Sequence, residues 1–245
     1  MNEIIATISR KGGTGKTTTA QTLADGIRRA GHSVLLVDLD SQANLTAAMG
    51  ADPDGLNSSD LFDIRTKPAR LIQHTDNGDI IPGAAELAAG DAELNDNGLL
   101  KNALKPFVKQ YDYIIIDTPA SYGRLTMNAL TAATQAIITT EPATFSADGL
   151  AELAKIIKQI RRTNKKLKIR GIIITRCDAR SNEVKQTIEE ICAAAAEIST
   201  DVLGTIRATS KVSSAQRHKQ NLFEYAPKAT AADDYKQIIN VLLNE

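Results

Sequence analysis

A glycine-rich segment near the start of the chain carries lysines and threonines suited to binding a phosphate. It reads Arg10-Lys11-Gly12-Gly13-Thr14-Gly15-Lys16-Thr17-Thr18 and lies between an apolar run over residues 4–8 and a helix-like run over residues 19–29. A strand that ends in such a turn and opens a helix points backbone N–H groups and the positive helix end at one place. We therefore expect an anion to bind there, and this pattern indicates a phosphate.

Different residues of this segment are suited to different parts of a polyphosphate and its metal ion. Lys16 is placed to reach the β- and γ-phosphates, and the Thr17 hydroxyl is placed to bind Mg²⁺. The glycines let the backbone curl close to the ligand. A glycine- and lysine-rich surface turn is the alternative, but strand, loop, helix and hydroxyl pair follow in the order of a phosphate site. The predicted binding residues are Lys11, Gly12, Gly13, Thr14, Gly15, Lys16, Thr17 and Thr18.

Carboxylates follow two later apolar runs. Residues 34–38 are typical of a buried parallel strand that brings Asp38 and Asp40 to its C-terminal end, and residues 113–116 lead in the same way to Asp117. Ligands of open α/β sheets bind at this edge. An aspartate there, beside a phosphate loop, typically holds Mg²⁺ through water, so Asp117 is predicted at the metal site with Thr17. A plain turn with an N-capping Asp40 or Ser41 is the alternative for Asp40, and a helix-capping aspartate is the alternative for Asp117.

Strand and helix patterns alternate along the 245 residues. This alternation predicts a single domain over residues 1–245, an α/β fold with a doubly wound, mostly parallel sheet and helices on both faces. Expected strands cover residues 4–8, 34–38, 79–82, 113–117, 135–140, 169–175 and 202–206. Expected helices cover residues 19–29, 59–64, 85–94, 98–110, 149–162 and 231–243.

The composition argues against a membrane-spanning protein, a zinc site and a disulfide framework. An apolar fraction of 42% with 24% charged residues is typical of a soluble globular protein. No apolar run approaches the about 20 residues that span a bilayer, and no leader pattern opens the chain, so we expect a cytoplasmic protein without a membrane partner. Cys177 and Cys192 lack C-x-x-C spacing, which argues against a zinc site or a disulfide framework.

Charge is unevenly distributed although the formal net charge is zero. Residues 38–96 hold twelve acidic and three basic side chains, whereas residues 155–180 hold ten basic side chains and one acid. We interpret the two sets as facing different partners. The basic run, joined by Arg207, Lys211, Arg217 and Lys219, would form a positive surface far from the acidic residues.

The phosphate segment departs from the usual pattern G-x-x-x-x-G-K-[ST], because Arg10 stands five positions before Gly15. With Lys11 ahead of the double glycine, the segment resembles the deviant phosphate loop of the ParA/MinD ATPase family, and Lys11 stands at that family's signature lysine. Residues 38–46 resemble the family's first switch region, with Asp40 where a carboxylate helps to orient the attacking water. Residues 113–120 are the third matching motif.

The resemblance to short ParA/Soj partition ATPases covers nearly the whole chain. It implies a Mg²⁺-dependent ATPase in which a homodimer encloses two ATP molecules, each Lys11 reaching the other subunit's phosphates. It implies Lys11, Lys16 and Asp40 as catalytic residues and Thr17, Asp40 and Asp117 at the metal. It also implies a ParB-like centromere-binding adaptor and the partition of plasmid or chromosomal DNA.

DNA binding without sequence preference is expected from the basic residues, which would make the protein nucleoid-associated. The candidate residues are Arg180, Lys211, Arg217 and Lys219, with a merely solvated charged surface as the alternative. The chain starts two residues before its first expected strand. We therefore expect neither the DNA-reading extension of larger partition proteins nor specific operator binding.

Three other classes of protein with the same type of phosphate loop are alternatives. A MinD-like membrane-surface ATPase ends in a basic amphipathic helix, whereas the last segment here holds Asp233, Asp234 and Glu245 against Lys236. A nitrogenase iron-protein type of ATPase would need paired cluster cysteines, which this chain does not have in matching motifs. A metabolic ligase similar to dethiobiotin synthetase is a further alternative.

Overall fold

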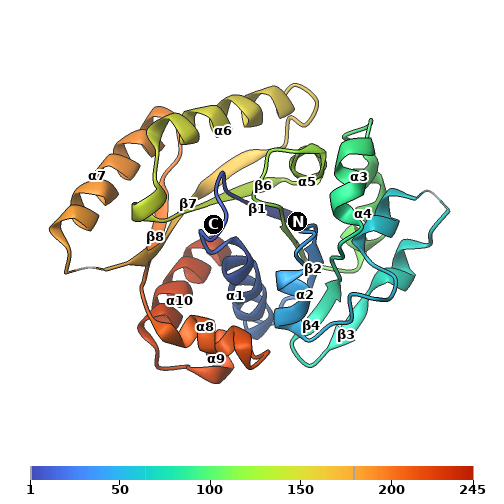
Figure 1. Cartoon of the computed structure of the whole chain (residues 1–245), viewed down its shortest axis with the longest axis horizontal. Helices are drawn as coiled ribbons and strands as arrows, with labels where there is room; N and C mark the ends of the chain where they lie inside the picture. Colours follow the sequence, from blue (N-terminus) through green and yellow to red (C-terminus); the bar gives the residue numbers. More distant parts are fainter. Residues whose placement is uncertain (1, 64, 179, 245) are drawn as a thin grey trace.

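The computed structural model describes residues 2–63, 65–178 and 180–244. These residues form an eight-stranded sheet in the order β3-β4-β2-β5-β1-β6-β7-β8 (Figure 1). Neighbouring strands are parallel except for the antiparallel pair β3 and β4. The strands are β1 (Glu3–Ile8), β2 (Val34–Asp38), β3 (Gln73–Thr75), β4 (Gly78–Ile81), β5 (Tyr113–Asp117), β6 (Gln135–Thr140), β7 (Lys168–Cys177) and β8 (Val202–Arg207).

Helices cover both faces of the sheet, and they bury its central strands on both sides. Along β1, Ile4, Ala6 and Ile8 join one apolar cluster, and Ile5 joins another on the opposite face. The first cluster includes side chains from α4 (Leu99–Leu104), α5 (Arg124–Ala132), α6 (Ala147–Ile160) and α7 (Asn182–Glu197), and α3 (Leu87–Glu93) adjoins α5. The second includes side chains from α1 (Lys16–Arg29), α2 (Asn44–Met49), α8 (Ser210–Arg217), α9 (Leu222–Tyr225) and α10 (Thr230–Leu243). The predicted doubly wound α/β fold is confirmed.

Several expected elements differ from the structure. The single helix expected over residues 98–110 is wrong: α4 ends at Leu104, and a 3₁₀ helix, η3 (Phe107–Lys109), follows. Pro106 stands between them and lacks the backbone N–H that an α-helix would need. The expected helix over residues 59–64 is a 3₁₀ helix, η1 (Ser58–Phe62), and residue 64 lies outside the described residues. The prediction did not include α2, α5, α7, α8, α9 or the edge strand β3.

The last helix packs its apolar stripe into the core. In α10, Tyr235, Ile238 and Ile239 are buried against α1 and β8, and the Tyr235 hydroxyl lies 3.0 Å from the Thr19 hydroxyl. This stripe is therefore part of the core and not a free amphipathic face. No helix among the described residues combines the length and apolar character that a membrane crossing requires.

Candidate functional site

The loop between β1 and α1 turns through two glycines in the left-handed region. Gly13 and Gly15 both have φ of 80°, a conformation that costs glycine little. Gly15 is the N-cap residue of α1, so Lys16 and Thr17 start the helix. The first N–H groups of a helix have no partner within it and carry its positive dipole end. This geometry suits the predicted phosphate.

A cavity of about 890 Å³ lies over the loop. Six of the eight predicted binding residues line it: Gly12, Gly13, Gly15, Lys16, Thr17 and Thr18. Its volume falls within the range of about 300–1,000 Å³ that is usual for small-molecule sites. The cavity therefore has room for a nucleotide with its phosphates at the start of α1.

Lys11 and Thr14 do not line this cavity but border a smaller one of about 50 Å³ beside the loop. The Thr14 hydroxyl is buried and donates to the Ser9 hydroxyl at 2.8 Å, and the backbone N–H of Lys11 donates to the same Ser9 oxygen at 3.3 Å. Thr14 thus stabilises the loop. The main chain of Lys11 is held while its side chain is exposed.

Asp117 and Thr17 meet at the C-terminal edge of the sheet. The Thr17 hydroxyl donates to Asp117 Oδ2 at 2.6 Å, and the Thr7 hydroxyl donates to Oδ1 at 3.2 Å. Burial raises the pKa of Asp117, and the nearby carboxylate of Asp38 raises this pKa further. A hydroxyl and a carboxylate are ligands suited to Mg²⁺, which commonly takes one or two protein ligands beside substrate phosphates. The donor set fits the expected metal, although no group of three or more His, Cys, Asp or Glu side chains among the described residues is placed to hold a metal ion.

Asp38 anchors the loop that follows β2. Its Oδ2 accepts hydrogen bonds from the Thr46 backbone N–H at 2.9 Å and the Thr46 hydroxyl at 2.7 Å, and its Oδ1 accepts from Asp40 N–H at 3.0 Å. Thr46 Oγ1 in turn accepts from Gly83 N–H at 2.7 Å. A Cβ at Gly83 would lie 2.7 Å from Asp38 Cγ, so only glycine fits this close approach.

Asp40 lines the cavity, as the metal and catalytic prediction requires. Its Oδ1 accepts a hydrogen bond from Gln42 N–H at 3.0 Å within a short turn. The N-cap residue of α2 is Ala43, with φ of 49°, and that of α5 is Gly123, so neither Asp40 nor Asp117 caps these helices. Helix capping is therefore wrong for both carboxylates, whereas the turn between Asp40 and Gln42 fits the plain turn that was the alternative for Asp40.

The far wall of the cavity comes from the C-terminal part of the chain. Gln216 Nε2 in α8 donates to the Thr18 hydroxyl at 2.9 Å, across 198 positions of sequence. A side pocket of about 190 Å³ continues between Thr18, the ends of β7 and β8, and α8. Arg176 also lines the cavity, and no pattern in the sequence pointed to it.

Arg217 and Lys219, predicted to bind DNA, both border the nucleotide cavity. Lys211 is exposed in the first turn of α8, and Arg180 is exposed and pairs with Asp178 at 3.1 Å. Arg207, at the end of β8, pairs with Asp234 of α10 at 2.7 Å.

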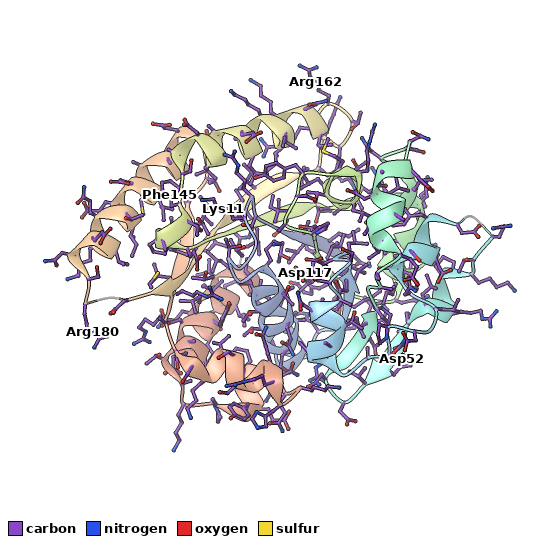
Figure 2. The ribbon with its side chains drawn as sticks, viewed as in Figure 1. Lys11, Asp52, Asp117, Phe145, Arg162 and Arg180 are labelled. Atoms are coloured by element: carbon purple, nitrogen blue, oxygen red, sulfur yellow. The ribbon has the colours of Figure 1, made fainter. Side chains whose placement is uncertain are left out.

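The basic run over residues 155–180 does not form one continuous surface. Strand β7 lies within this run and is ten residues long, which separates its two ends by about 30 Å. Lys165 and Lys166 precede the strand, whereas Arg176 and Arg180 belong to the edge that carries the cavity. Figure 2 places Arg162 near the end of α6 and Arg180 on another side of the molecule. The interpretation of the run as one positive surface is wrong.

Comparison with known proteins places this site in a family. A family model described as an AAA domain matches residues 2–169. The sporulation initiation inhibitor protein Soj of Bacillus subtilis is 34% identical over 96% of this chain and 96% of its own length. Cobyrinic acid a,c-diamide synthase from Mycobacterium smegmatis, solved with ADP and magnesium, is 29% identical with a TM-score of 0.85, covering 99% of this chain and 94% of that one. The septum site-determining protein MinD from Pyrococcus horikoshii, solved with Mg-ADP, is 26% identical with a TM-score of 0.81, covering 100% of this chain and 97% of that one.

A second family model, described as 4Fe-4S iron sulfur cluster binding proteins of the NifH/frxC family, matches residues 98–245. The cysteines present do not fit such a cluster. Cys177 is buried in β7, where burial raises the pKa of its thiol to about 11, and Cys192 is exposed on α7. Cluster ligands are thiolates, usually four in number. We therefore attribute this match to the shared fold and derive no cluster chemistry from it.

Replacing Thr46 with valine tests the anchor of the loop after β2. We expect Thr46→Val to lower the free energy of unfolding by about 1–3 kcal/mol, because Asp38 loses a donor and Gly83 N–H loses its acceptor in a buried place. The matched control is Thr131→Val, since Thr131 donates only to the Met127 carbonyl of its own helix. Urea unfolding of both variants checks this, and equal effects would contradict the anchoring role.

Proposed function

The chain belongs to the ParA/MinD-type P-loop ATPases, and from that premise we propose that it is a partition ATPase. In this proposal it hydrolyses ATP with Mg²⁺, forms a homodimer when ATP binds, associates with DNA without sequence preference and works with a ParB-like adaptor. The similarity to Soj supports the partition role. ATP and Mg²⁺ are the ligands expected from the family, and the ADP and magnesium in related structures agree with them.

The placement of Lys11 is the observation that carries this proposal. Lys16 is 6% exposed and lines the cavity of its own chain, whereas Lys11 is exposed and lies outside that lining. The Lys11 side chain therefore does not line the site where the phosphates of its own nucleotide would bind. A second subunit facing the loop would supply the phosphate that Lys11 contacts.

The residues of the site divide the reaction as follows. Lys16 and the N–H groups at the start of α1 bind the phosphates, and Thr17 and Asp117 hold Mg²⁺, which neutralises charge on the transferred phosphoryl group. Asp40 orients the attacking water from the loop after β2. Gln216 and the side pocket beyond Thr18 accept the nucleoside end of ATP.

Two other functions fit the observations less well. A MinD-like membrane role would need a free amphipathic face, and the apolar stripe of α10 is buried against α1 and β8. A P-loop ligase is the second candidate, favoured by the similarity to the cobyrinic acid a,c-diamide synthase. ATP turnover without any carboxylate substrate separates the partition ATPase from the ligase.

Lys11 and Lys16 should have separable roles. We expect Lys11→Ala to keep ATP binding, to lose ATP-dependent dimerisation and to hydrolyse ATP about 100-fold more slowly. Lys16→Ala should lose ATP binding itself, because Lys16 serves the phosphates of its own chain. Sedimentation with ATP and nucleotide-binding titrations check both variants. A Lys11→Ala protein that dimerises like wild type would contradict the shared site.

Asp40→Ala should separate binding from chemistry. Because Asp40 orients water and does not hold the nucleotide, we expect this variant to bind ATP, to dimerise and to hydrolyse about 100-fold more slowly. Single-turnover hydrolysis with radiolabelled ATP measures the effect, and Gln42→Ala is the control in the same loop. Hydrolysis at the wild-type rate in Asp40→Ala would contradict the catalytic role, and Asp40 would then only stabilise its turn.

DNA binding should depend on the basic residues at the cavity edge of the sheet. We expect Arg180→Glu with Lys211→Glu to weaken ATP-dependent binding to all duplexes alike. The log–log salt slope should fall by about 0.9 for each DNA phosphate that the variant no longer neutralises. Lys165→Glu with Lys166→Glu is the matched control, since these exposed lysines precede β7 at its other end. Filter binding at several salt concentrations decides the result, and an equal weakening in the control pair would contradict the assignment.

A further inference from the structure

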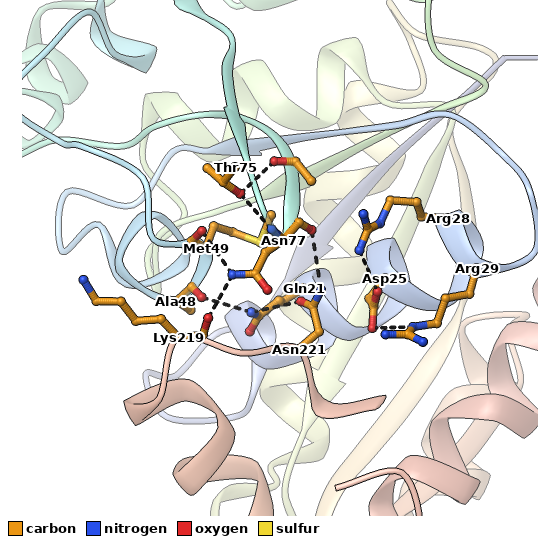
Figure 3. A network of polar contacts seen from close by, with 11 residues as sticks. Gln21, Asp25, Arg28, Arg29, Ala48, Met49, Thr75, Asn77, Lys219 and Asn221 are labelled. Atoms are coloured by element: carbon orange, nitrogen blue, oxygen red, sulfur yellow. Dashed lines mark hydrogen bonds and ion pairs between the residues drawn. The ribbon is translucent and has the colours of Figure 1, made fainter. Parts of the chain in front are cut away.

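Three side-chain amides join separate walls of the nucleotide cavity, and the reaction outlined above does not use them. They are Gln21 in α1, Asn77 in the turn between β3 and β4, and Asn221 immediately before α9 (Figure 3). We call these three residues the amide network. Gln21 and Asn221 are 4% and 1% exposed, and buried amides require hydrogen-bond partners.

Asn77 links two of the walls with a single NH₂ group. Its Nδ2 donates to the carbonyl oxygen of Lys219 at 2.9 Å and to that of Met49 at 3.3 Å (Figure 3). Met49 is the last residue of α2, and the two residues before it line the cavity. Lys219 lines the cavity from the segment after α8. One amide therefore fixes α2 relative to the C-terminal wall.

Gln21 and Asn221 extend the link to the phosphate-binding helix. Gln21 Nε2 donates to Ala48 O and to Asn221 Oδ1, both at 3.3 Å, and Asn221 Nδ2 donates to Asn77 O at 3.5 Å. The last carbonyl groups of a helix have no partner within it. For α2, the donors to Ala48 and Met49 come from α1 and from the β3–β4 turn.

Lys219 adopts a backbone conformation that depends on these contacts. Its φ is 53°, in the left-handed region that a residue with a Cβ rarely adopts. Its N–H donates to Gln216 O at 3.0 Å, and its carbonyl accepts from Asn77. Both ends of this residue are thus held, and Gln216 itself contacts Thr18 of the phosphate-binding helix.

We propose that Asn77 is a positioning residue for nucleotide binding, because it sets α2 and Lys219 at the separation that the bound nucleotide requires. This inference rests on the proposed ATPase function and extends it to a residue outside the phosphate loop and the loop that carries Asp40. Asn77 touches neither the metal site nor Lys11. Its removal should therefore weaken the binding of ATP and ADP alike and leave the rate of the bound complex almost unchanged.

Asn77→Ala tests the proposal through the split between affinity and rate. We expect the Kd for both ATP and ADP to rise about tenfold, the net value of one to two hydrogen bonds, and kcat at saturating ATP to change less than about twofold. Asp76→Ala is the matched control, because Asp76 occupies the same turn with an exposed side chain. That control should leave both Kd values unchanged.

Asn77→Asp separates positioning from stability. Aspartate has nearly the same size and shape as asparagine, so this variant keeps the side chain of the turn while it loses the NH₂ donors. We expect its nucleotide affinities to fall at least as far as those of Asn77→Ala. A lower melting temperature with unchanged Kd for both nucleotides, or a lower kcat with unchanged KM, would overturn the proposal. Failure of the wild-type chain to bind ATP would refute the proposed function instead.

Discussion

Two carboxylates buried at the ends of neighbouring central strands set the arrangement of the site. Asp38 of β2 and Asp117 of β5 stand opposite one another in the register, and both are 0% exposed. Burial raises the pKa of each carboxyl group. Keeping both groups charged therefore costs free energy in the folded chain. Hydroxyl groups of Thr7, Thr17 and Thr46 offset part of this cost.

This constraint explains why the expected metal site and the loop after β2 lie in the same place. A divalent cation beside Thr17 would offset the remaining charge of Asp117, so metal binding relieves a cost already present in the fold. Asp38 meanwhile binds Thr46 and thereby closes the loop that carries Asp40. Asp40, the proposed catalytic carboxylate, thus lies on a short segment with both ends anchored and lines the cavity.

The rest of the cavity is assembled by polar contacts between distant segments. Gln216 reaches Thr18, and the amide network connects α1, α2 and the segment before α9. These contacts use amide side chains, which offer donors and acceptors without charge, so they add no further cost near the buried carboxylates. The phosphate loop and the nucleoside side of the cavity are therefore held as one unit.

The sequence alone determined the features that depend on local pattern. The glycines and lysines of residues 10–18 predicted the phosphate loop, and the apolar runs before Asp38 and Asp117 placed both residues at one edge of a parallel sheet. That inference works because the C-terminal ends of parallel strands necessarily meet at the same edge. The alternation of strands and helices likewise predicted the α/β fold, although Pro106 divided one expected helix.

Only the tertiary structure decided which distant residues share the cavity and which charges lie together. Hydrophobic periodicity indicates which face of a helix or strand is buried, but not which elements pack against it. Those neighbours depend on the strand order, which places β1 between β5 and β6. Asn77 therefore carried no signal in the sequence. The basic run was misread for the same reason: its residues are consecutive in the chain, and β7 places them at opposite edges of the sheet.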